Sequence, residues 1–291
     1  MKRIALKIDV DTFHGTLRGV PTLIDLLKSH SANGTFFVTL GPDRSGKQPR
    51  RHSLKSHYDL ATRLNGRILP APTIGTRATK ELCTIKDAGF EIGLHAWDRV
   101  LWEQQIGEMD NASVESEMCT AVDRFENLFG TAPTAFSAPG WLTNRHALRL
   151  TQRLGFAYAS DCRGDRPFIP VIDGEIVCCP QIPTTLPTLD EVMAIERSYT
   201  ADQAADRLFS LSKAIDGDHV FTLRAELEGM RFRDTFSRLL SRWAEEDFEL
   251  VSLEALASSI SLDELPRCVV SQTDIAGRYG PRFTQGETFL E

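Results

Sequence analysis

Hydrophobic and polar positions along this chain predict strands and helices in regular alternation. Short apolar runs of strand length are followed by segments in which apolar residues recur every three or four positions, as on a helix with one buried face. Several helical segments stop at a glycine, which readily adopts the left-handed conformation found at helix C-termini. We predict a helix carrying Leu23, Leu26 and Leu27 behind Pro21, further helices over 78–88, 114–129, 146–154, 201–215, 232–246 and 253–260, and strands over 4–11, 35–40, 90–95, 135–138, 156–160, 176–182, 220–224 and 248–251.

This order of elements favours one α/β domain over two domains. Seven or eight strand-helix alternations without a repeat or a linker predict a parallel sheet closed into a barrel, which we place over residues 1–291. Residues 41–76 are too long for a plain connection, and we expect a basic lid or binding loop there. From about residue 266 the chain is rich in turn-forming residues, and we expect an irregular tail packed on the barrel.

Charge narrows the range of partners. The 291 residues carry a net charge of −7, which argues against nucleic acid as the main partner because phosphate binding needs a basic surface. Residues 41–69, however, carry +5. This stretch is either a solvated loop or a contact for anionic lipid or phosphate.

Part of the basic stretch has a helical pattern. Its apolar and basic residues interleave at roughly helical spacing, so an amphipathic helix at an anionic membrane surface and a helix docked on the barrel both fit. The six cysteines form no C-x-x-C pair, and we read them as reduced thiols of a cytoplasmic protein. The residues of this pattern are Leu54, Tyr58, Leu60, Ala61, Leu64 and Ile68, with Arg51, Lys55, Arg63 and Arg67 between them.

Polar residues at the ends of predicted strands are the candidates for chemistry. Asp9 and Asp11 lie two apart on a strand, so both side chains emerge on one face. Two carboxylates that close repel each other unless a cation lies between them or one is protonated. His95 closes another apolar strand. The alternative to a functional role is that Asp9 and Asp11 are acids at a loop entry and that His95 is a hydrogen-bonded core residue.

A family resemblance rests on five segments taken in order. They are Asp9-Val10-Asp11, Gly93-Leu94-His95-Ala96-Trp97-Asp98, Ala138-Pro139-Gly140-Trp141, Ser160-Asp161-Cys162-Arg163-Gly164 and Ala225-Glu226-Leu227-Glu228-Gly229. These segments resemble the successive motifs of the polysaccharide deacetylase (NodB-homology) family. Within it they are most similar to the branch of 4-deoxy-4-formamido-L-arabinose-phosphoundecaprenol deformylases.

The resemblance implies a fold and a set of site residues. The family has a distorted (β/α) barrel, here of seven or eight strands, with a zinc-like divalent metal held by one aspartate and two histidines. Asp11 and His95 match metal ligands, and Asp9 matches the general base. The resemblance also adds Asp161 and Arg163 to the catalytic set, and Pro139, Gly140 and Trp141 to the substrate-binding set.

Two family residues are replaced by arginine. The second metal histidine corresponds to Arg99 and the acid histidine to Arg224. A guanidinium neither coordinates a cation nor gives up a proton usefully at neutral pH. Asp11 and His95 alone are fewer than the three or so protein ligands of a catalytic zinc. The candidates for a replacement ligand or acid are His14, Asp98 and Glu226, whose structural alternatives are a loop surface residue, a helix cap and a salt-bridge partner. A bound metal and no cofactor at all both remain open.

We hypothesise that Arg99 and Arg224 occupy the metal region and pair with the two aspartates; the alternative is that both point to solvent. The first function is a carbohydrate amide hydrolase acting on an amino sugar, linked to undecaprenyl phosphate, in lipid A or envelope glycan modification at the inner face of the inner membrane. Asp9 would then activate water, and an arginine would stabilise the oxyanion. The second is an inactive paralogue that binds a phosphate-linked sugar or a protein partner.

Overall fold

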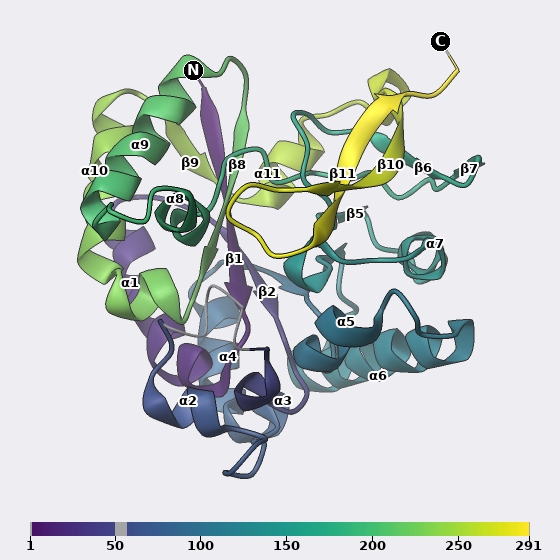
Figure 1. The fold of residues 1–291 in the computed structure, drawn as a ribbon, viewed down its shortest axis with the longest axis horizontal. Helices are drawn as coiled ribbons and strands as arrows, with labels where there is room; N and C mark the ends of the chain where they lie inside the picture. Colours follow the sequence, from purple (N-terminus) through teal and green to yellow (C-terminus); the bar gives the residue numbers. More distant parts are fainter. Residues whose placement is uncertain (1, 50–56, 291) are drawn as a thin grey trace.

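A seven-stranded parallel sheet forms the centre of the computed structural model, which describes residues 2–49 and 57–290 (Figure 1). The strand order is β5-β4-β3-β2-β1-β8, and β9 pairs with β1 outside this path. Seven of the eight predicted strands are confirmed, with shorter ends. They are β1 (Arg3–Val10), β2 (Thr35–Val38), β3 (Glu91–Leu94), β4 (Ala135–Phe136), β5 (Tyr158–Ala159), β8 (His219–Arg224) and β9 (Glu249–Val251).

An irregular segment joins the two open edges of the sheet. Ile182 N donates to the carbonyl of Ala159 on β5 (2.8 Å), and Leu186 N donates to the carbonyl of Val220 on β8 (3.1 Å). The hydroxyls of Thr184 and Thr222 are 2.7 Å apart. The sheet therefore curls into a distorted barrel whose open side is bridged by this segment, in agreement with the predicted fold class.

The two faces of β1 (Arg3–Val10) have different roles. Ile4, Leu6 and Ile8 pack with the surrounding helices, whereas Ala5 belongs to a separate apolar cluster inside the barrel. Alternation along the strand therefore directs Lys7 and Asp9 inward as well. Lys7 Nζ donates to the carbonyl of Ser160 (2.6 Å), and burial lowers the pKa of this amine. The interior thus changes from apolar to charged toward the carboxyl end of the strand.

Helices cover the outside of the sheet. In Figure 1, α1, α9 and α10 lie on the left, and α5, α6 and α7 lie on the right. Asp110 caps α6 through Ser113 N (2.7 Å), and Gly130 ends it at φ 74°. All predicted helices are present, and among the longer helices α5 and α8 are additional. The longer helices are α1 (Val20–Ser29), α4 (Thr79–Asp87), α5 (Arg99–Gln105), α6 (Asn111–Phe129), α7 (Arg145–Arg153), α8 (Leu189–Ile195), α9 (Ala201–Ala214), α10 (Arg233–Glu245) and α11 (Leu253–Ser258).

Two short π-helical turns after β1 and β8 pack backbone against backbone. They are η1 (Gly15–Gly19) and η5 (Leu227–Arg231). A Cβ on Gly19 would lie 1.9 Å from the carbonyl oxygen of Ala225, and one on Gly229 would lie 2.6 Å from the carbonyl oxygen of Gly19. Only glycine permits this approach, which brings the loops at the carboxyl ends of β1 and β8 together.

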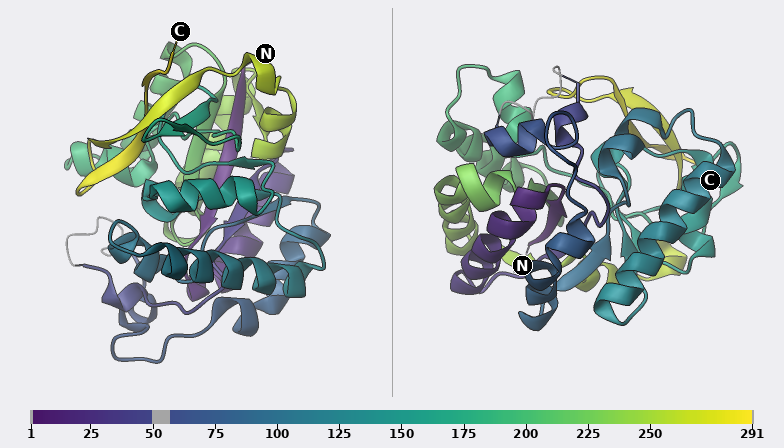
Figure 2. Two further views of the ribbon diagram at one scale, coloured as in Figure 1. Left: turned by 90° about the vertical axis from the view of Figure 1, so that its right-hand side faces the viewer. Right: turned by 90° about the horizontal axis from the view of Figure 1, so that it is seen from below.

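The predicted irregular tail is instead a β-hairpin. The strands β10 (Arg267–Asp274) and β11 (Pro281–Thr288) pair antiparallel, and β10 also pairs with β6 (Ile169–Ile172). The hairpin crosses one side of the barrel (Figure 2) and is held there because Arg163 N donates to the carbonyl of Phe283 (2.9 Å). The predicted strand over 176–182 is also wrong, since Ile176 ends a hairpin strand, β7 (Glu175–Ile176), and only the chain from Gln181 lies along the barrel.

The lid region does not form one amphipathic helix. It contains three short turns: η2 (Ser45–Lys47), α2 (Leu60–Leu64) and α3 (Ile74–Arg77). Tyr58 is buried, whereas Leu60 and Ile68 are 65% and 73% exposed, so these apolar residues do not share one face. Of the residues in the predicted pattern, Leu54, Arg51 and Lys55 lie outside the described residues. In the part of the chain that is described, no helix has the length and apolar character needed to span a membrane.

Candidate active site

The inward-facing end of β1 meets the end of β8. Asp9 and Arg224 are direct partners in the parallel register of these strands, so their side chains start as neighbours on the same face. Both residues are buried, at 4% and 3% exposure. Asp9 Oδ1 has no hydrogen-bond partner within the described residues. This carboxylate is therefore a buried acceptor left for a ligand or water.

Asp11 is the centre of a buried charge cluster. His95 Nε2 lies 3.3 Å from its Oδ1, Arg99 Nε lies 3.6 Å from Oδ1, and Arg224 Nε lies 3.6 Å from Oδ2. Burial alone would raise the pKa of Asp11, but Arg99, His95 and Arg224 outweigh it and lower the pKa to about 2. Asp11 is therefore ionised at neutral pH, and both arginines point inward to it rather than to solvent. Neither arginine forms an ion pair with Asp9 in the described structure, so the predicted pairing holds for one aspartate only.

Each arginine is held by its Nη atoms, and its Nε is left without a hydrogen bond. Arg99 begins α5, with Nη1 3.0 Å from Glu103 Oε1 and Nη2 donating to Ser45 Oγ (3.0 Å). Arg224 Nη1 donates to Asp190 Oδ1 (3.1 Å). Within the described chain neither Nε has a hydrogen-bond partner, because their distances to Asp11 are too long. The two guanidinium groups are thus fixed in orientation, and the Nε–H donor of each is left for a substrate.

A second layer of charge holds Arg224 in place. Asp190 also pairs with Arg278 Nη1 (3.1 Å), and Arg278 Nε pairs with Glu191 Oε1 (2.7 Å). Arg163 Nη1 lies 2.9 Å from the same Glu191 oxygen. The structure thus places Arg163 in this outer layer, in a position that orders the site.

Trp141 is a platform in this layer. Its ring is 2% exposed, and its Nε1 donates to Thr184 Oγ1 (3.1 Å). The guanidinium carbons of Arg163 and Arg278 lie 4.9 and 5.1 Å from the ring centre. Trp141 follows Pro139 and Gly140 in η4 (Pro139–Trp141). The buried Trp141 ring packs against the arginine side chains, whereas Gly140 lines a cavity.

Asp161 lies deeper in the barrel. Its Oδ1 accepts from Ala138 N (2.7 Å) and its Oδ2 from Gln181 Nε2 (3.0 Å). Burial raises the pKa of Asp161 to about 6, although these hydrogen bonds and Lys7 oppose the rise. The carboxyl group therefore fixes the backbone of the Ala138 motif from beneath.

Two of the three candidate replacement ligands have other roles. His14 Nδ1 lies 2.7 Å from Asp59 Oδ2, which ties the first loop to the lid. Asp98 caps α5 by accepting from Leu101 N (3.0 Å), and its Oδ2 lies 2.5 Å from Arg44 Nη1. Each of these side chains is thus engaged by a structural partner in this structure, and their role as replacement ligands stays a prediction.

Glu226 does lie in the cluster. It is 5% exposed, and neither carboxyl oxygen has a hydrogen-bond partner among the residues described. Burial, followed by the charge of Asp11, raises its pKa well above the ordinary value, against the pull of Arg99 and Arg224. Tyr58 Oη is likewise buried and unpartnered. Burial beside Asp11 therefore favours the protonated form of Glu226, in which its carboxyl group is a hydrogen-bond donor.

The donor set does not fit a catalytic divalent metal. Across residues 2–49 and 57–290, no three His, Cys, Asp or Glu side chains are placed to hold one ion. Asp11 and His95 are adjacent, but Arg99 and Arg224 lie at the same carboxylate. Guanidinium groups stand where further ligands would be needed, and they repel a cation.

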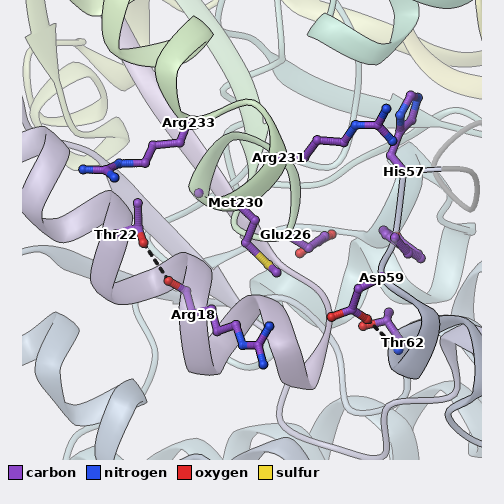
Figure 3. Close-up of a pocket in the computed structure, with 11 residues that line it drawn as sticks. Arg18, Thr22, His57, Asp59, Thr62, Glu226, Met230, Arg231 and Arg233 are labelled. Atoms are coloured by element: carbon purple, nitrogen blue, oxygen red, sulfur yellow. Dashed lines mark hydrogen bonds between the residues drawn. The ribbon is translucent and has the colours of Figure 1, made fainter.

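Cavities open on two sides of the cluster. One of about 580 Å³ ends at Glu226 and Tyr58 and is lined by residues of η1, η5 and the lid (Figure 3). The other, of about 610 Å³, reaches Arg224 and lies between Gly140 and the turn of the C-terminal hairpin. Glu226 thus borders the first cavity and Arg224 borders the second.

Sequence reasoning missed Tyr58, Glu103 and Asp190 as members of this site. A signal existed for Asp190, because Thr188 and Glu191 form a capping box that begins α8. Tyr58 lies in the lid and Glu103 follows Arg99 by one helical turn, a spacing typical of an ion pair. Without the fold, neither the position of Tyr58 in the lid nor the spacing of Arg99 and Glu103 indicates that these residues belong to the site around Asp11.

Buried Glu228 gives the fold a pH dependence. Burial raises its pKa to about 7, opposed by the hydrogen bond from Arg224 N (2.8 Å). Because the pKa of this carboxyl group is raised, its protonated form stabilises the fold. This stabilisation is fully present below the ordinary pKa of 4.5 and is lost as the pH rises through about 7. Between those pH values the free energy of unfolding of the unaltered protein should fall by on the order of 3 kcal/mol because of Glu228. Urea denaturation of Glu228→Gln should not show this fall. Exposed Glu245→Gln is the control, and an unchanged slope in Glu228→Gln would contradict this.

Comparison with known proteins agrees with the fold and the motifs. The polysaccharide deacetylase family model matches residues 2–159. A protein of Shewanella sediminis (strain HAW-EB3), named probable 4-deoxy-4-formamido-L-arabinose-phosphoundecaprenol deformylase, is 32% identical over 290 residues, covering 96% of this chain and 93% of its own. A protein of Wigglesworthia glossinidia brevipalpis with the same name is 32% identical over 282 residues, covering 91% and 96%.

Solved structures share the fold at low identity. A Mycobacterium smegmatis structure assigned to the polysaccharide deacetylases has a TM-score of 0.68 at 17% identity, covering 94% of this chain and 96% of the other. A Bacillus anthracis protein described as a CE4 family pseudoenzyme has a TM-score of 0.54 at 11% identity, covering 88% and 65%. The match to the family model and the identity to full-length relatives establish that this chain belongs to the polysaccharide deacetylase family.

Proposed function

We propose that this protein is a carbohydrate amide hydrolase that removes a formyl or acetyl group from an amino sugar linked to undecaprenyl phosphate. The observation that carries the proposal is a group of buried, unpartnered polar atoms gathered near Asp11. Asp9 Oδ1, the Nε atoms of Arg99 and Arg224, and both carboxyl oxygens of Glu226 lack protein hydrogen bonds in the described residues. Each such atom costs about 1–3 kcal/mol, so a ligand that satisfies them together is favoured.

The chemistry assigned to these atoms is a water attack on the amide carbon. Asp9 accepts a proton from water as its oxygen bonds to that carbon, and the amide oxygen becomes an oxyanion. The Nε–H groups of Arg99 and Arg224 stabilise that oxyanion, a role that a fixed guanidinium can perform. Glu226 donates its proton to the nitrogen as the carbon-nitrogen bond breaks, leaving a free amine and formic or acetic acid. The acid returns a proton to Glu226 as it becomes formate or acetate, and Asp9 releases its proton to solvent.

The named relatives support the choice of substrate. The two relatives at 32% identity are named for a formamido-arabinose joined to phosphoundecaprenol, and each is covered over more than nine-tenths of its length. Asp9, Asp11 and His95 remain in this chain, and Arg99 and Arg224 supply permanent positive charge at the same carboxylate. The alternative of an inactive sugar-binding paralogue is an outcome of the activity test.

Hydrolysis should depend on Asp9 and should resist chelation. Asp9→Asn removes the base, and we expect kcat to fall by a factor of about 10² to 10⁴. Formate or acetate release from a formamido or acetamido sugar phosphate, assayed with and without a chelator, measures both properties. Arg207→Gln, an exposed change on α9, is the control. If the protein shows no turnover, and turnover appears only in the Arg99→His, Arg224→His double variant with zinc, then it is the inactive paralogue.

Zinc affinity should rise when a ligand replaces Arg99. Asp11 and His95 supply two ligands, and Arg99→His adds a third while removing a repelling cation. We expect at least a roughly tenfold gain in zinc affinity, measured by competition with a chromogenic zinc indicator. Arg207→His controls for a histidine added at the surface. Tight stoichiometric zinc binding by the unaltered protein would rule out the arginine assignment.

We also propose that the protein acts at the cytoplasmic face of the inner membrane, in peripheral contact with anionic lipid. Leu60, Ile68 and Leu69 are 65%, 73% and 41% exposed, and Arg63 and Arg67, which lie between Leu60 and Ile68 in the sequence, are exposed as well. This segment combines apolar side chains with positive charge, a combination that binds anionic interfaces.

Binding to phosphatidylglycerol liposomes should weaken with salt. Each arginine near an anionic surface contributes about 1 kcal/mol, so Arg63→Gln and Arg67→Gln should each lower partitioning about fivefold in a sedimentation assay. Zwitterionic liposomes are the control. Binding that is absent, or that does not respond to salt, would refute the membrane contact.

A further inference from the structure

The cavity that ends at Glu226 is built by the two glycine-packed loops. Residues of η1 and α1 form one wall, residues of η5 form the opposite wall, and residues 57–62 of the lid form the third. Figure 3 shows Arg18 and Arg231 on opposite sides, with Glu226 and Met230 between them. Its volume of about 580 Å³ is in the range of small-ligand sites.

The charge around this cavity is mostly positive and unpaired. Arg18, Arg231 and Arg233 are exposed, and in the described structure none of the three has an ion-pair partner. Arg238 and Arg242, on the next turns of α10, do pair with Asp202 and Asp206. The arginines at the cavity are thus distinguished from nearby surface arginines by having no carboxylate.

The acidic residues of the cavity do not cancel this charge. Asp59 Oδ2 already interacts with His14 Nδ1 at 2.7 Å. Glu226 has a raised pKa, caused first by burial and then by Asp11, and is neutral when protonated. Burial and Arg231 lower the pKa of His57, so its imidazole is uncharged. The cavity therefore has a net positive wall without an internal counter-ion.

The floor of the cavity offers hydrogen bonds that the protein does not use. Tyr58 Oη and both oxygens of Glu226 are buried without partners, and both residues are more than nine-tenths buried. Tyr58 and a protonated Glu226 are donors. Donors below and guanidinium groups above suit a small oxyanion with several acceptor oxygens.

We propose that this cavity binds the phosphate ester group of the substrate, between Arg18 and Arg231, while the sugar extends past Glu226 toward Asp9. The proposal rests on the proposed function for the identity of the sugar, but the phosphate recognition stands on the cavity alone. Lipid-linked and soluble sugar phosphates share this chemistry. Glu226 borders both the cavity and the Asp11 cluster, so the two parts of one substrate can be bound together.

Equilibrium binding of soluble phosphate esters tests the cavity without requiring turnover. The probes are a pentose 1-phosphate, the same pentose without phosphate, and geranyl phosphate as a short prenyl phosphate, titrated by calorimetry into the full chain. We expect Arg18→Gln and Arg231→Gln each to weaken both phosphate esters about tenfold, because each removes a charge-assisted contact. Arg207→Gln should leave affinity unchanged, and thermal unfolding verifies that the variants fold.

The outcomes separate the sources and the two proposals. Tighter binding of geranyl phosphate indicates a lipid-linked ester, and tighter binding of the pentose 1-phosphate indicates a soluble one; either supports the cavity if the arginine changes weaken it. Failure of both esters to bind, or affinities that the arginine changes do not alter, overturns the phosphate site even if hydrolysis occurs. Arginine-dependent phosphate binding without hydrolysis leaves this site standing and removes the proposed function alone.

Discussion

The ionised carboxylate of Asp11 between two buried guanidinium groups is the interaction on which this site depends. Arg99 and Arg224 are 2% and 3% exposed, and burying a cation is costly unless opposite charge lies close by. Asp11 supplies that charge to both, and Glu103 and Asp190 each supply it to one. Removing Asp11 would leave two like charges facing each other in the interior. The buried charge of Asp11 and the buried charges of the two arginines therefore stabilise each other.

Arg99 and Arg224 stand at positions where the family resemblance implies histidines, and they place a different kind of cation at the barrel mouth. A metal ion exchanges with solvent and polarises bound water, whereas a guanidinium is covalently attached and offers directed N–H donors. The outer layer of Asp190, Glu191, Arg278 and Trp141 holds the donors of Arg224 in one orientation. An arrangement with this many supporting contacts is consistent with a site that retains a function.

Much of the architecture was predictable from periodicity, and so was the convergence of strand ends. Asp9 and Arg224 meet because the carboxyl ends of neighbouring parallel strands share one edge. The C-terminal hairpin was not predictable, since β10 buries only Cys268 and Val270, leaves Val269 exposed and otherwise carries polar residues, so its pairing comes from β6 and β11. The lid was misread because Tyr58 turns inward to the charge cluster while Ile68 stays outside. Contacts between distant segments decided these cases, and no local pattern encodes them.

X-ray diffraction from crystals grown with excess zinc, recorded at the zinc absorption edge, tests the central claim most directly. The account predicts density for Arg99 and Arg224 directed at Asp11 and no anomalous peak between Asp11 and His95. A strong peak there, bonded to both side chains with the guanidinium groups displaced, would contradict it.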